Sequence, residues 1–474
     1  DIIMKLQDYL IMHKESKKIA IRCGTQSVSY HDLYLKCRKL ADELTKYNVD
    51  VIGLLMDNSI EFIIGFYGIL LSEKSVLLLN SNYGQREVLE LLNISAVEVV
   101  VSLSKFKAKI PDNIQLVKID NPQRSDNKTI LNANRKDDDV AIIIPTSGTT
   151  GIPKLVMLTH DSLDYLIQKI KQIHNVKTGE RELVVLPLSS IYAVTTQLLI
   201  CIYAEMELII LEGKFDIKNL FQVCAKYRPI YSEMVPTMLK AIALYYNPRD
   251  GYLSSLRRIT LGGEKITADD LRIIQEKFSD VILLQGYGMS ESGALITEKM
   301  YDDYKIKLDS VGKPFGDVQI KIVSDNDKKL GENEIGEILV KGPNMMAGYF
   351  PVRENFQDNW FATGDLGYID EDGYLYICGR KKNLIISSGY NVMPEEIEAI
   401  IMKSEKVKEV KVYGEKSYTT GEIIVADVVF YDNDTADTIE LQKFCKRNLA
   451  AYKIPKKINI VDKLERTITH KVRR

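Results

Sequence analysis

Short apolar runs alternate with helix-period segments through most of this chain, and this alternation restricts the fold more than any other feature. The runs are rich in Val, Ile and Leu, and they include Val51–Met56, Ser75–Leu79, Val97–Ser102, Val140–Ile144, Glu182–Leu186, Glu207–Leu211, Arg258–Leu261 and Val281–Leu284. Amphipathic segments lie between them, among them Tyr30–Tyr47, Gln85–Leu92 and Asp216–Lys226. Apolar strands joined by helices are typical of parallel sheets with helices on both faces. The sequence therefore predicts an α/β fold.

The second half of the sequence has a different character. Glycines, alternating hydrophobicity and charged turns over Gly312–Gly348 predict a smaller, more antiparallel β region. From about Lys381, strand-like runs mixed with helix patterns predict a separate α+β domain. A chain of 474 residues is also too long for one ordinary domain. We therefore expect a large N-terminal domain over residues 1–380, with a small barrel-like β region beside its parallel sheets, and a small C-terminal domain over residues 381–474.

The composition argues against several classes of protein. The 63 Lys and Arg residues nearly balance 65 Asp and Glu residues, so there is no electrostatic case for nucleic-acid binding. Six scattered cysteines without a C-x-x-C pair, and five histidines, argue against a zinc site and suit a reducing cytoplasm. No apolar run approaches the ~20 residues that span a bilayer, and the apolar segment Ile60–Leu71 is interrupted by Glu61 and two glycines, which predicts a core helix.

A loop rich in glycine and hydroxyl groups follows the apolar run Val140–Ile144. Residues 145–154 read Pro-Thr-Ser-Gly-Thr-Thr-Gly-Ile-Pro-Lys. Glycines let a backbone curl around an anion, successive N–H groups then form a nest for phosphate oxygens, and hydroxyls and a lysine add donors. Two residues separate the glycines, so the loop is not a Walker A loop. The alternative to a phosphate loop is an exposed Ser/Thr/Gly turn. The phosphate-binding candidates are Thr146, Ser147, Gly148, Thr149, Thr150, Gly151 and Lys154.

This loop resembles the phosphate-loop signature of the carboxylate-activating adenylate-forming enzymes, which include acyl-CoA synthetases, peptide-synthetase adenylation domains and firefly luciferase. Further segments resemble the family's other motifs, in the family's order: Gln285–Glu291, Trp360–Asp365, Gly379–Asn383, Ser387–Glu398 and Glu465–Arg474. The resemblance covers nearly the full length of the chain. It implies a large domain that binds ATP and the acyl substrate, and a small domain that is mobile.

The resemblance implies a role for each residue around the nucleotide. Tyr287, between Gly286 and Gly288, would lie against the adenine ring. Ser290 would reach the α-phosphate, and Glu291 would help to hold Mg²⁺, a cation that prefers carboxylate and phosphate oxygens. Two further residues would complete the nucleotide site: Asp365, which would accept hydrogen bonds from both ribose hydroxyls, and Arg380, which would contact ribose or phosphate.

The C-terminal motifs imply the moving and catalytic parts. Lys382 occupies the hinge position, where backbone torsions are expected to change as the small domain turns between two half-reactions. Gly389 would line the tunnel for the pantetheine thiol. Lys471 would be the catalytic lysine, which offsets the charge that builds up as a carboxylate attacks the α-phosphate. Two departures from the family pattern flank it, because Glu465 replaces a proline and His470 replaces a glycine.

The acyl side carries weaker signals. Ser190 and Ile191 stand where the family's amino-acid-activating and aryl-acid-activating members place an aspartate and an asparagine. Burying an ammonium group without a counter-charge costs several kcal/mol. The absence of the aspartate therefore disfavours an α-amino acid substrate. The expected pocket is apolar and suits an aliphatic or otherwise uncharged acyl group. Its candidate residues are Ile191, Tyr192, Thr196, Met234, Val235 and Gly262.

The expected function is ATP-dependent activation of a carboxylic acid to an acyl-adenylate, followed by transfer to a thiol. ATP, Mg²⁺ and coenzyme A are the expected cofactors, and the Gly389–Glu398 segment favours free coenzyme A. A competing hypothesis is a stand-alone adenylation enzyme that loads an acyl or aminoacyl group onto the phosphopantetheine of a carrier protein. A nucleotide-binding regulator without catalysis and a luciferase-like oxygenase are two less favoured hypotheses.

Overall fold

The computed structural model divides the chain into two compact units, residues 1–319 with 341–360 and residues 320–340 with 361–474. It describes residues 4–120, 140–146, 153–213, 215–263, 266, 268–299, 307–387, 390–417, 421–431 and 436–465. The first unit contains two large sheets, and the second contains two smaller ones.

Within the described residues of the first unit, six strands form a sheet in the order β6-β5-β3-β4-β7-β8. Neighbouring strands are parallel except for the antiparallel pair β7 and β8. The strands are β3 (Val51–Met56), β4 (Ser75–Asn80), β5 (Val99–Ser102), β6 (Gln115–Lys118), β7 (Val140–Thr146) and β8 (Lys154–Thr159). The central strands are buried on both faces, which explains why their sequences are uninterrupted apolar runs.

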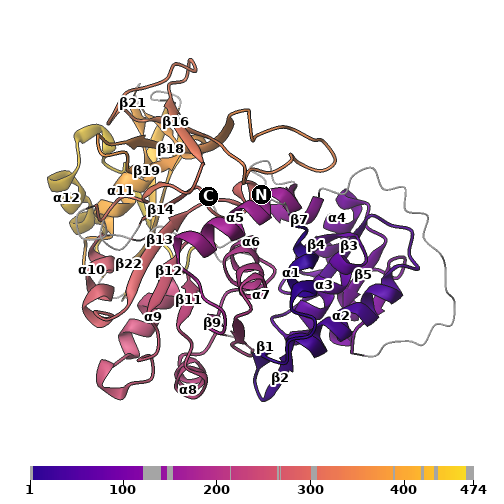
Figure 1. The fold of residues 1–474 in the computed structure, drawn as a ribbon. Coiled ribbons are helices and arrows are strands. Elements are labelled where there is room, and N and C mark those ends of the chain that lie inside the picture. Colours follow the sequence, from indigo (N-terminus) through magenta and orange to yellow (C-terminus); the bar gives the residue numbers. More distant parts are fainter. Residues whose placement is uncertain are drawn as a thin grey trace. The chain divides into compact units, whose positions relative to one another are not determined.

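Helices cover both faces of this sheet, as Figure 1 shows beside β3, β4 and β5. Successive side chains of a strand point to opposite faces. Leu54 faces Gly65 of α3 (Ile60–Leu71), whereas Gly53 faces Leu92 of α4 (Gln85–Ser95). Helix α2 (Tyr30–Leu44) packs against α3, which is buried along nearly its whole length. The apolar segment Ile60–Leu71 is therefore the core helix that the sequence predicts.

A second sheet of the first unit runs in the order β15-β14-β13-β12-β11-β9-β10-β1-β2 among the described residues. Its central strands, from β13 to β1, are parallel, and the strands at both edges are antiparallel. The strands are β1 (Ile19–Cys23), β2 (Gln26–Ser29), β9 (Arg181–Val184), β10 (Glu207–Ile210), β11 (Tyr231–Met234), β12 (Arg258–Leu261), β13 (Ile282–Tyr287), β14 (Thr297–Lys299) and β15 (Lys313–Pro314).

The remaining helices of this unit connect its strands, except α1, which precedes β1. A π-helical turn over Val194–Leu199 joins α6 to α7, so these three elements form one continuous helical segment. The helices are α1 (Leu6–Met12), α5 (His160–Ile173), α6 (Ile191–Ala193), α7 (Ile200–Tyr203), α8 (Ile217–Tyr227), α9 (Pro236–Tyr245) and α10 (Ala268–Lys277). No helix in the described ranges is both long and apolar enough to cross a membrane.

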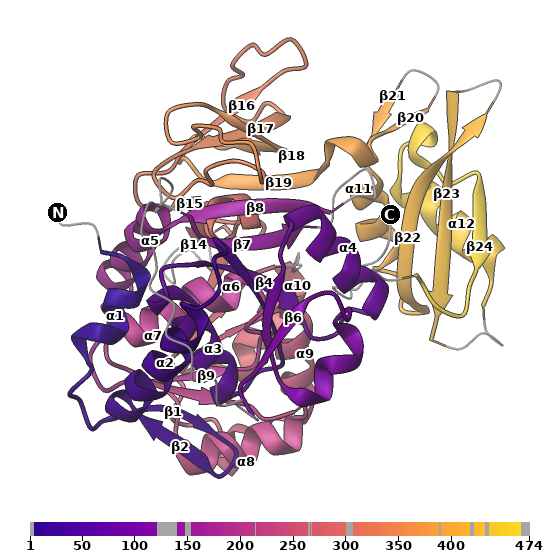
Figure 2. The same ribbon diagram turned by 90° about the vertical axis from the view of Figure 1, so that its right-hand side faces the viewer.

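The second unit contains a four-stranded and a five-stranded sheet in its described residues. The first comprises β16 (Gln319–Val323), β17 (Gly336–Lys341), β18 (Phe361–Ile369) and β19 (Leu375–Arg380). The second comprises β20 (Ile385–Ser387), β21 (Tyr390–Val392), β22 (Val407–Ser417), β23 (Gly421–Phe430) and β24 (Lys457–Ile460). Figure 2 shows the long strands β22 and β23 side by side, and helices α11 (Pro394–Ile401) and α12 (Thr438–Asn448) contribute to their apolar core.

The structure confirms the predicted α/β class, and most predicted elements differ from the observed ones only at their ends. The run predicted as a strand over Val97–Ser102 begins at Val99, because Ala96 and Val97 close the preceding helix. Ala96 adopts a left-handed conformation, and the N–H of Val97 donates to the carbonyl of Leu92. The backbone N–H groups at such a C-cap donate to carbonyls of the helix, so they are not available to pair with a neighbouring strand.

We predict that Gly68→Val destabilises the first unit. A Cβ at Gly68 would lie 2.6 Å from Cδ2 and 3.1 Å from Cβ of Leu40, so a larger side chain forces α2 and α3 apart. Overpacking of this kind costs about 1–3 kcal/mol. Urea unfolding measures the effect, and Leu35→Ala on the exposed side of α2 is the control, expected within about 0.5 kcal/mol of wild type. An unchanged unfolding midpoint for Gly68→Val would contradict the close packing.

Candidate functional site

The predicted phosphate loop connects the two strands of a β-hairpin. Thr146 at the end of β7 pairs in register with Lys154 at the start of β8. The hydroxyl of Thr146 donates to the carbonyl of Lys154 over 3.4 Å. Ser147, Gly148, Thr149, Thr150 and Gly151 lie outside the described residues. The exposed ammonium of Lys154 lies 4.6 Å from the centroid of the Tyr349 ring.

The predicted metal ligand lies on a tight turn that follows a parallel strand. Strand β13 ends at Tyr287, and Ser290 and Glu291 form part of a one-turn 3₁₀ helix, Ser290–Ser292. Between them, a Cβ on Gly288 would lie 1.7 Å from the carbonyl oxygen of Ala294. Only glycine fits at this close approach of two backbones. The motif's second glycine therefore determines the path of the chain towards Glu291.

Residues 344–350, here called the clamp segment, hold this turn from the other side. The buried side-chain amide of Asn344 donates to the carbonyls of Ser292 (2.9 Å) and Leu295 (2.7 Å). The N–H of Met346 donates to the carbonyl of Glu291 over 2.8 Å. The turn that carries Glu291 is thus fixed by backbone and amide bonds and does not depend on its own side chain.

The same clamp segment also pairs with the strand that leaves the phosphate loop. The N–H of Ala347 donates to the carbonyl of Met157, and the N–H of Phe350 donates to the carbonyl of Leu155. Between them, the hydroxyl of Tyr349 donates to Oε1 of Glu291 over 2.7 Å. Burial, and then the neighbouring Glu291 carboxylate, raise the pKa of Tyr349. Three segments that are distant in sequence therefore meet around one tyrosine.

The carboxylate of Glu291 fits the ligand that Mg²⁺ requires. The side chain is half-buried, and Oε1 accepts the Tyr349 hydrogen bond. No described residue donates a hydrogen bond to Oε2, which leaves a hard oxygen available. Mg²⁺ in nucleotide enzymes is usually held by one or two carboxylates together with substrate phosphates. Among the described residues no group of three or more His, Cys, Asp or Glu side chains could hold a metal ion.

In the second unit, Asp365, the predicted ribose ligand, and Arg380, predicted to contact ribose or phosphate, lie opposite each other on neighbouring strands. Asp365 of β18 and Arg380 of β19 are register partners, and Oδ1 of Asp365 lies 2.7 Å from Nε of Arg380. Asp365 is only 4% exposed. The hydroxyl of Thr363 accepts from the N–H of Asp365, and Nη1 of Arg380 donates to the Thr363 carbonyl. Gly364, at φ +72°, provides the left-handed turn between them.

The predicted hinge residue lies just beyond this ion pair. Lys382 is exposed in a one-turn helix, Lys381–Asn383, which connects β19 to β20. The neighbouring Lys381 binds Oε2 of Glu337 at 2.7 Å. Two other predicted residues, Gly389 of the thiol tunnel and the catalytic candidate Lys471, lie outside the described residues.

The acyl-pocket candidates lie at the carboxyl ends of two neighbouring parallel strands, where ligands of α/β sheets bind. Met234 ends β11, Val235 follows it, and Gly262 follows β12. Tyr192 lies against Gly262, since a Cβ there would be 2.9 Å from Cζ of the tyrosine. The remaining candidates come from the helical segment after β9: Ile191, which is buried, and Thr196, whose hydroxyl donates to the carbonyl of Tyr192.

Polar groups that the sequence interpretation missed lie behind Tyr192. Its hydroxyl donates to Oε2 of Glu233 over 2.9 Å, and the side-chain amide of Gln197 donates to Oε1 of Glu182 over 2.9 Å. Both glutamates are buried. Burial raises the pKa of Glu182 to about 7, although Gln197 and Arg258 oppose the shift. Carboxyl groups therefore lie behind the pocket wall that the sequence predicts as apolar. The sequence feature that could have revealed them is a glutamate within each of two apolar strand runs.

We predict that the free energy of unfolding falls less between about pH 5 and about pH 8 in Glu182→Gln than in the wild type. A carboxyl group whose pKa rises from 4.5 to about 7 on folding stabilises the protein below pH 4.5 and loses that contribution as pH rises through 7. The wild-type slope from this group is at most about 1.4 kcal/mol per pH unit. Urea midpoints at about pH 5 and about pH 8 test this. The exposed Glu276→Gln control should behave like wild type; equal slopes in all three proteins would contradict the prediction.

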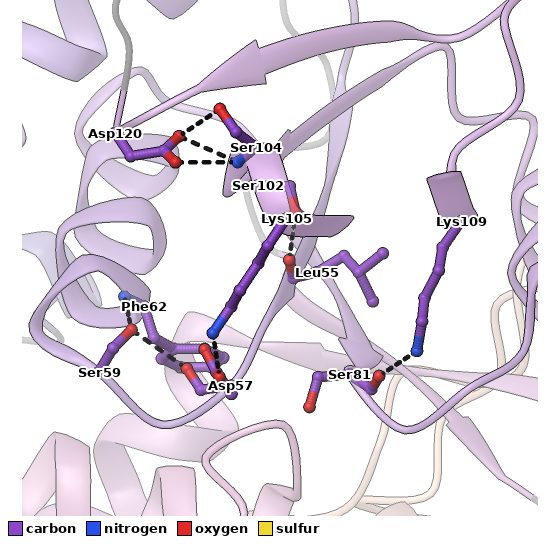
Figure 3. Close-up of polar contacts among 10 residues, drawn as sticks. All are labelled: Leu55, Asp57, Ser59, Phe62, Ser81, Ser102, Ser104, Lys105, Lys109 and Asp120. Atoms are coloured by element: carbon purple, nitrogen blue, oxygen red, sulfur yellow. Dashed lines mark hydrogen bonds and ion pairs between the residues drawn. The ribbon is translucent and has the colours of Figure 1, made fainter. Parts of the chain in front are cut away.

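A cavity of about 420 Å³ near the carboxyl ends of β4 and β5 is lined in part by Ser104, Lys105 and Lys107. Figure 3 shows the contacts of Lys105, which lines the cavity, and of Lys109, which lies nearby in sequence. Lys105 Nζ lies 2.5 Å from Oδ2 of Asp57, and Lys109 Nζ donates to the carbonyl of Ser81 over 2.6 Å. The ammonium group of Lys105, which lines the cavity, therefore already binds a carboxylate, and that of Lys109 binds a backbone carbonyl.

Comparison with known proteins identifies the family. The family model for AMP-binding enzymes matches residues 11–350, and that for the AMP-binding enzyme C-terminal domain matches residues 396–471. A 2-succinylbenzoate–CoA ligase of Bacillus licheniformis is 31% identical over 96% of both chains.

Solved structures agree with this match. The o-succinylbenzoate CoA synthetase of Bacillus subtilis in complex with its acyl-adenylate intermediate is 28% identical, has a TM-score of 0.87, and is matched over 98% of this chain and 96% of that chain. The same enzyme in complex with ATP and magnesium gives the same identity and TM-score over 98% of each chain. The chain belongs to the AMP-binding enzyme family and is an ATP-dependent, AMP-forming acyl-CoA ligase.

Proposed function

We propose that this ligase activates an aromatic carboxylic acid and transfers the acyl group to coenzyme A. The first candidate, 2-succinylbenzoate, keeps a second carboxylate after activation, so this proposal departs from the uncharged acyl group that the sequence predicts. The observation that supports the proposed site is that Lys154 and Glu291 both contact Tyr349. The proposed phosphate-binding cation and the proposed metal-binding carboxylate would thus lie beside the same residue. The similar enzymes of Bacillus licheniformis and Bacillus subtilis are named for 2-succinylbenzoate. The ring of Tyr192 against Gly262 also provides a flat aromatic wall, which suits an aromatic acid.

The first half-reaction forms the acyl-adenylate. A carboxylate oxygen of the acid attacks the α-phosphorus of ATP, and the bond to the bridging oxygen breaks to release pyrophosphate. In this proposal the loop Thr146–Lys154 binds the β- and γ-phosphates and Tyr287 contacts adenine, with Gly286, Gly288 and Ser290 shaping the α-phosphate side. Asp365 binds the ribose, and Arg380 contacts the ribose or a phosphate. Mg²⁺ held by Glu291 supplies positive charge to the phosphate oxygens, and Lys471 offsets charge between the two anions.

The second half-reaction forms the thioester. The thiolate of coenzyme A attacks the acyl carbon, and AMP leaves. We propose that residues 381–474 turn about Lys382 between the two steps and that Gly389 then lines the thiol tunnel. No protein nucleophile is required, so positioning and electrostatics supply most of the rate. We also propose a cytoplasmic enzyme, since none of the six cysteines, all of them within the described residues, forms a disulfide.

We predict that Lys471→Ala abolishes adenylation and spares ATP binding. Loss of the positive charge beside the α-phosphate removes transition-state stabilisation, which lowers the rate of acid-dependent ATP–pyrophosphate exchange by about 10²-fold or more. The dissociation constant for ATP should change less than about threefold, because ground-state contacts remain. Lys463→Ala, at an exposed lysine nearby in sequence, is the control and should keep full exchange. Normal exchange by Lys471→Ala would overturn the assignment.

The acid and the acceptor are tested together. We expect 2-succinylbenzoate to give the highest kcat/KM for pyrophosphate exchange in a panel that includes benzoate, 4-coumarate, a long-chain fatty acid and amino acids. With the best acid, AMP release should depend on coenzyme A. Release that requires a pantetheinylated carrier protein would instead favour the carrier-loading hypothesis. Absence of exchange with every acid, with ATP binding intact, would favour a regulator.

A further inference from the structure

Tyr349 makes two polar contacts that no sequence motif predicts. Its hydroxyl donates to Oε1 of Glu291 over 2.7 Å, and its ring lies beneath the ammonium of Lys154 at 4.6 Å from the ring centroid. The first contact uses the polar end of the side chain, and the second uses its π-face. One residue therefore contacts both the proposed metal ligand and the cation at the end of the proposed phosphate loop.

The backbone fixes the position of Tyr349 independently of these contacts. It forms an isolated antiparallel bridge with Val156 of β8, flanked by hydrogen bonds from Met157 to Gly348 and from Phe350 to Leu155. Gly348, at φ +113°, makes the turn before it, and a Cβ there would lie 2.4 Å from the carbonyl of Val352. The tyrosine thus stands on a paired segment, which makes it a rigid support.

We propose that Tyr349 is a positioning residue of the adenylating site, which orients the Glu291 carboxylate for Mg²⁺ and supports Lys154 for the ATP phosphates. The inference rests on the proposed function, in which these two residues contact the metal and the phosphates. A hydroxyl that occupies Oε1 leaves Oε2 directed to other ligands, and hydrogen-bonding partners of this kind orient metal-binding carboxylates. The tyrosine ring attracts the ammonium through its negative face.

The two contacts predict separable effects. Tyr349→Phe removes the hydroxyl and keeps the ring, so it should weaken Mg²⁺ binding and leave metal-free nucleotide binding unchanged. Tyr349→Leu removes both contacts and should also weaken metal-free nucleotide binding, by about two- to fivefold for a cation–π contact at an exposed lysine. If Tyr349 had only a packing role, the two variants would not separate the effect on Mg²⁺ affinity from the effect on nucleotide affinity.

The experiment is a calorimetric titration of Mg²⁺ into the full chain saturated with the α,β-methylene analogue of ATP, which does not react. We expect the dissociation constant for Mg²⁺ to rise about tenfold in Tyr349→Phe, the usual effect of removing a hydrogen bond to a metal-binding group. Tyr231→Phe is the matched control, since Tyr231 donates to Oε2 of Glu180 over 2.8 Å, and it should bind Mg²⁺ like wild type. Wild-type Mg²⁺ affinity in Tyr349→Phe would overturn the proposal.

A double-mutant cycle tests whether the hydroxyl acts through Glu291. In a Glu291→Gln background, Tyr349→Phe should change Mg²⁺ affinity less than about twofold, because the carboxylate that the hydroxyl orients is absent. Equal effects in both backgrounds would contradict the proposed route.

Failure of the proposed function has a different result. Wild-type protein would then bind the analogue without dependence on Mg²⁺, or it would lack acid-dependent pyrophosphate exchange. Thermal unfolding of each variant without ligand identifies any general loss of folding.

Discussion

The pairing of the clamp segment with two other parts of the first unit is the interaction on which the proposed nucleotide site depends. Its backbone binds β8 through Ala347 and Phe350 and binds the Glu291 turn through Met346. These bonds are made by main-chain groups, so they fix the position of the site before any ligand contact is made. A carboxylate and an ammonium that are held on such a frame need little reorganisation when charge develops on the phosphates, which is the condition for electrostatic catalysis.

The acyl side is built on a different principle. Parallel strands β9, β11 and β12 bring Glu182, Glu233 and Arg258 together in the buried layer behind Tyr192. Burial opposes ionisation of both glutamates, and the pKa of each is raised. The hydrogen bond from the Tyr192 hydroxyl to the Glu233 carboxyl group holds the tyrosine ring in a defined place. The shape of the acyl pocket is thus tied to a buried polar network, and not only to apolar packing.

Much of the fold follows from local sequence patterns. The apolar runs predict β3, β4 and β12 within a residue of their observed ends, because strands buried on both faces need no alternation. The Ser290–Glu291 turn and the Asp365–Arg380 pair also lie where the motifs suggest useful chemistry. The apolar description of the acyl wall was incomplete, since a glutamate within a strand run does not reveal which side chains it meets.

The sequence by itself determined the α/β class, the order of the strands along the chain and the residue types available for nucleotide chemistry, because these depend on periodicity and on short motifs. Only the tertiary structure decided that Tyr349 contacts Glu291, 58 positions away, and that Tyr192 contacts Glu233, 41 positions away. Such contacts depend on which strands become neighbours in a sheet and on where a returning segment crosses them. Hydrophobic periodicity records the buried face of each element, but it carries no information about the partner that this face meets.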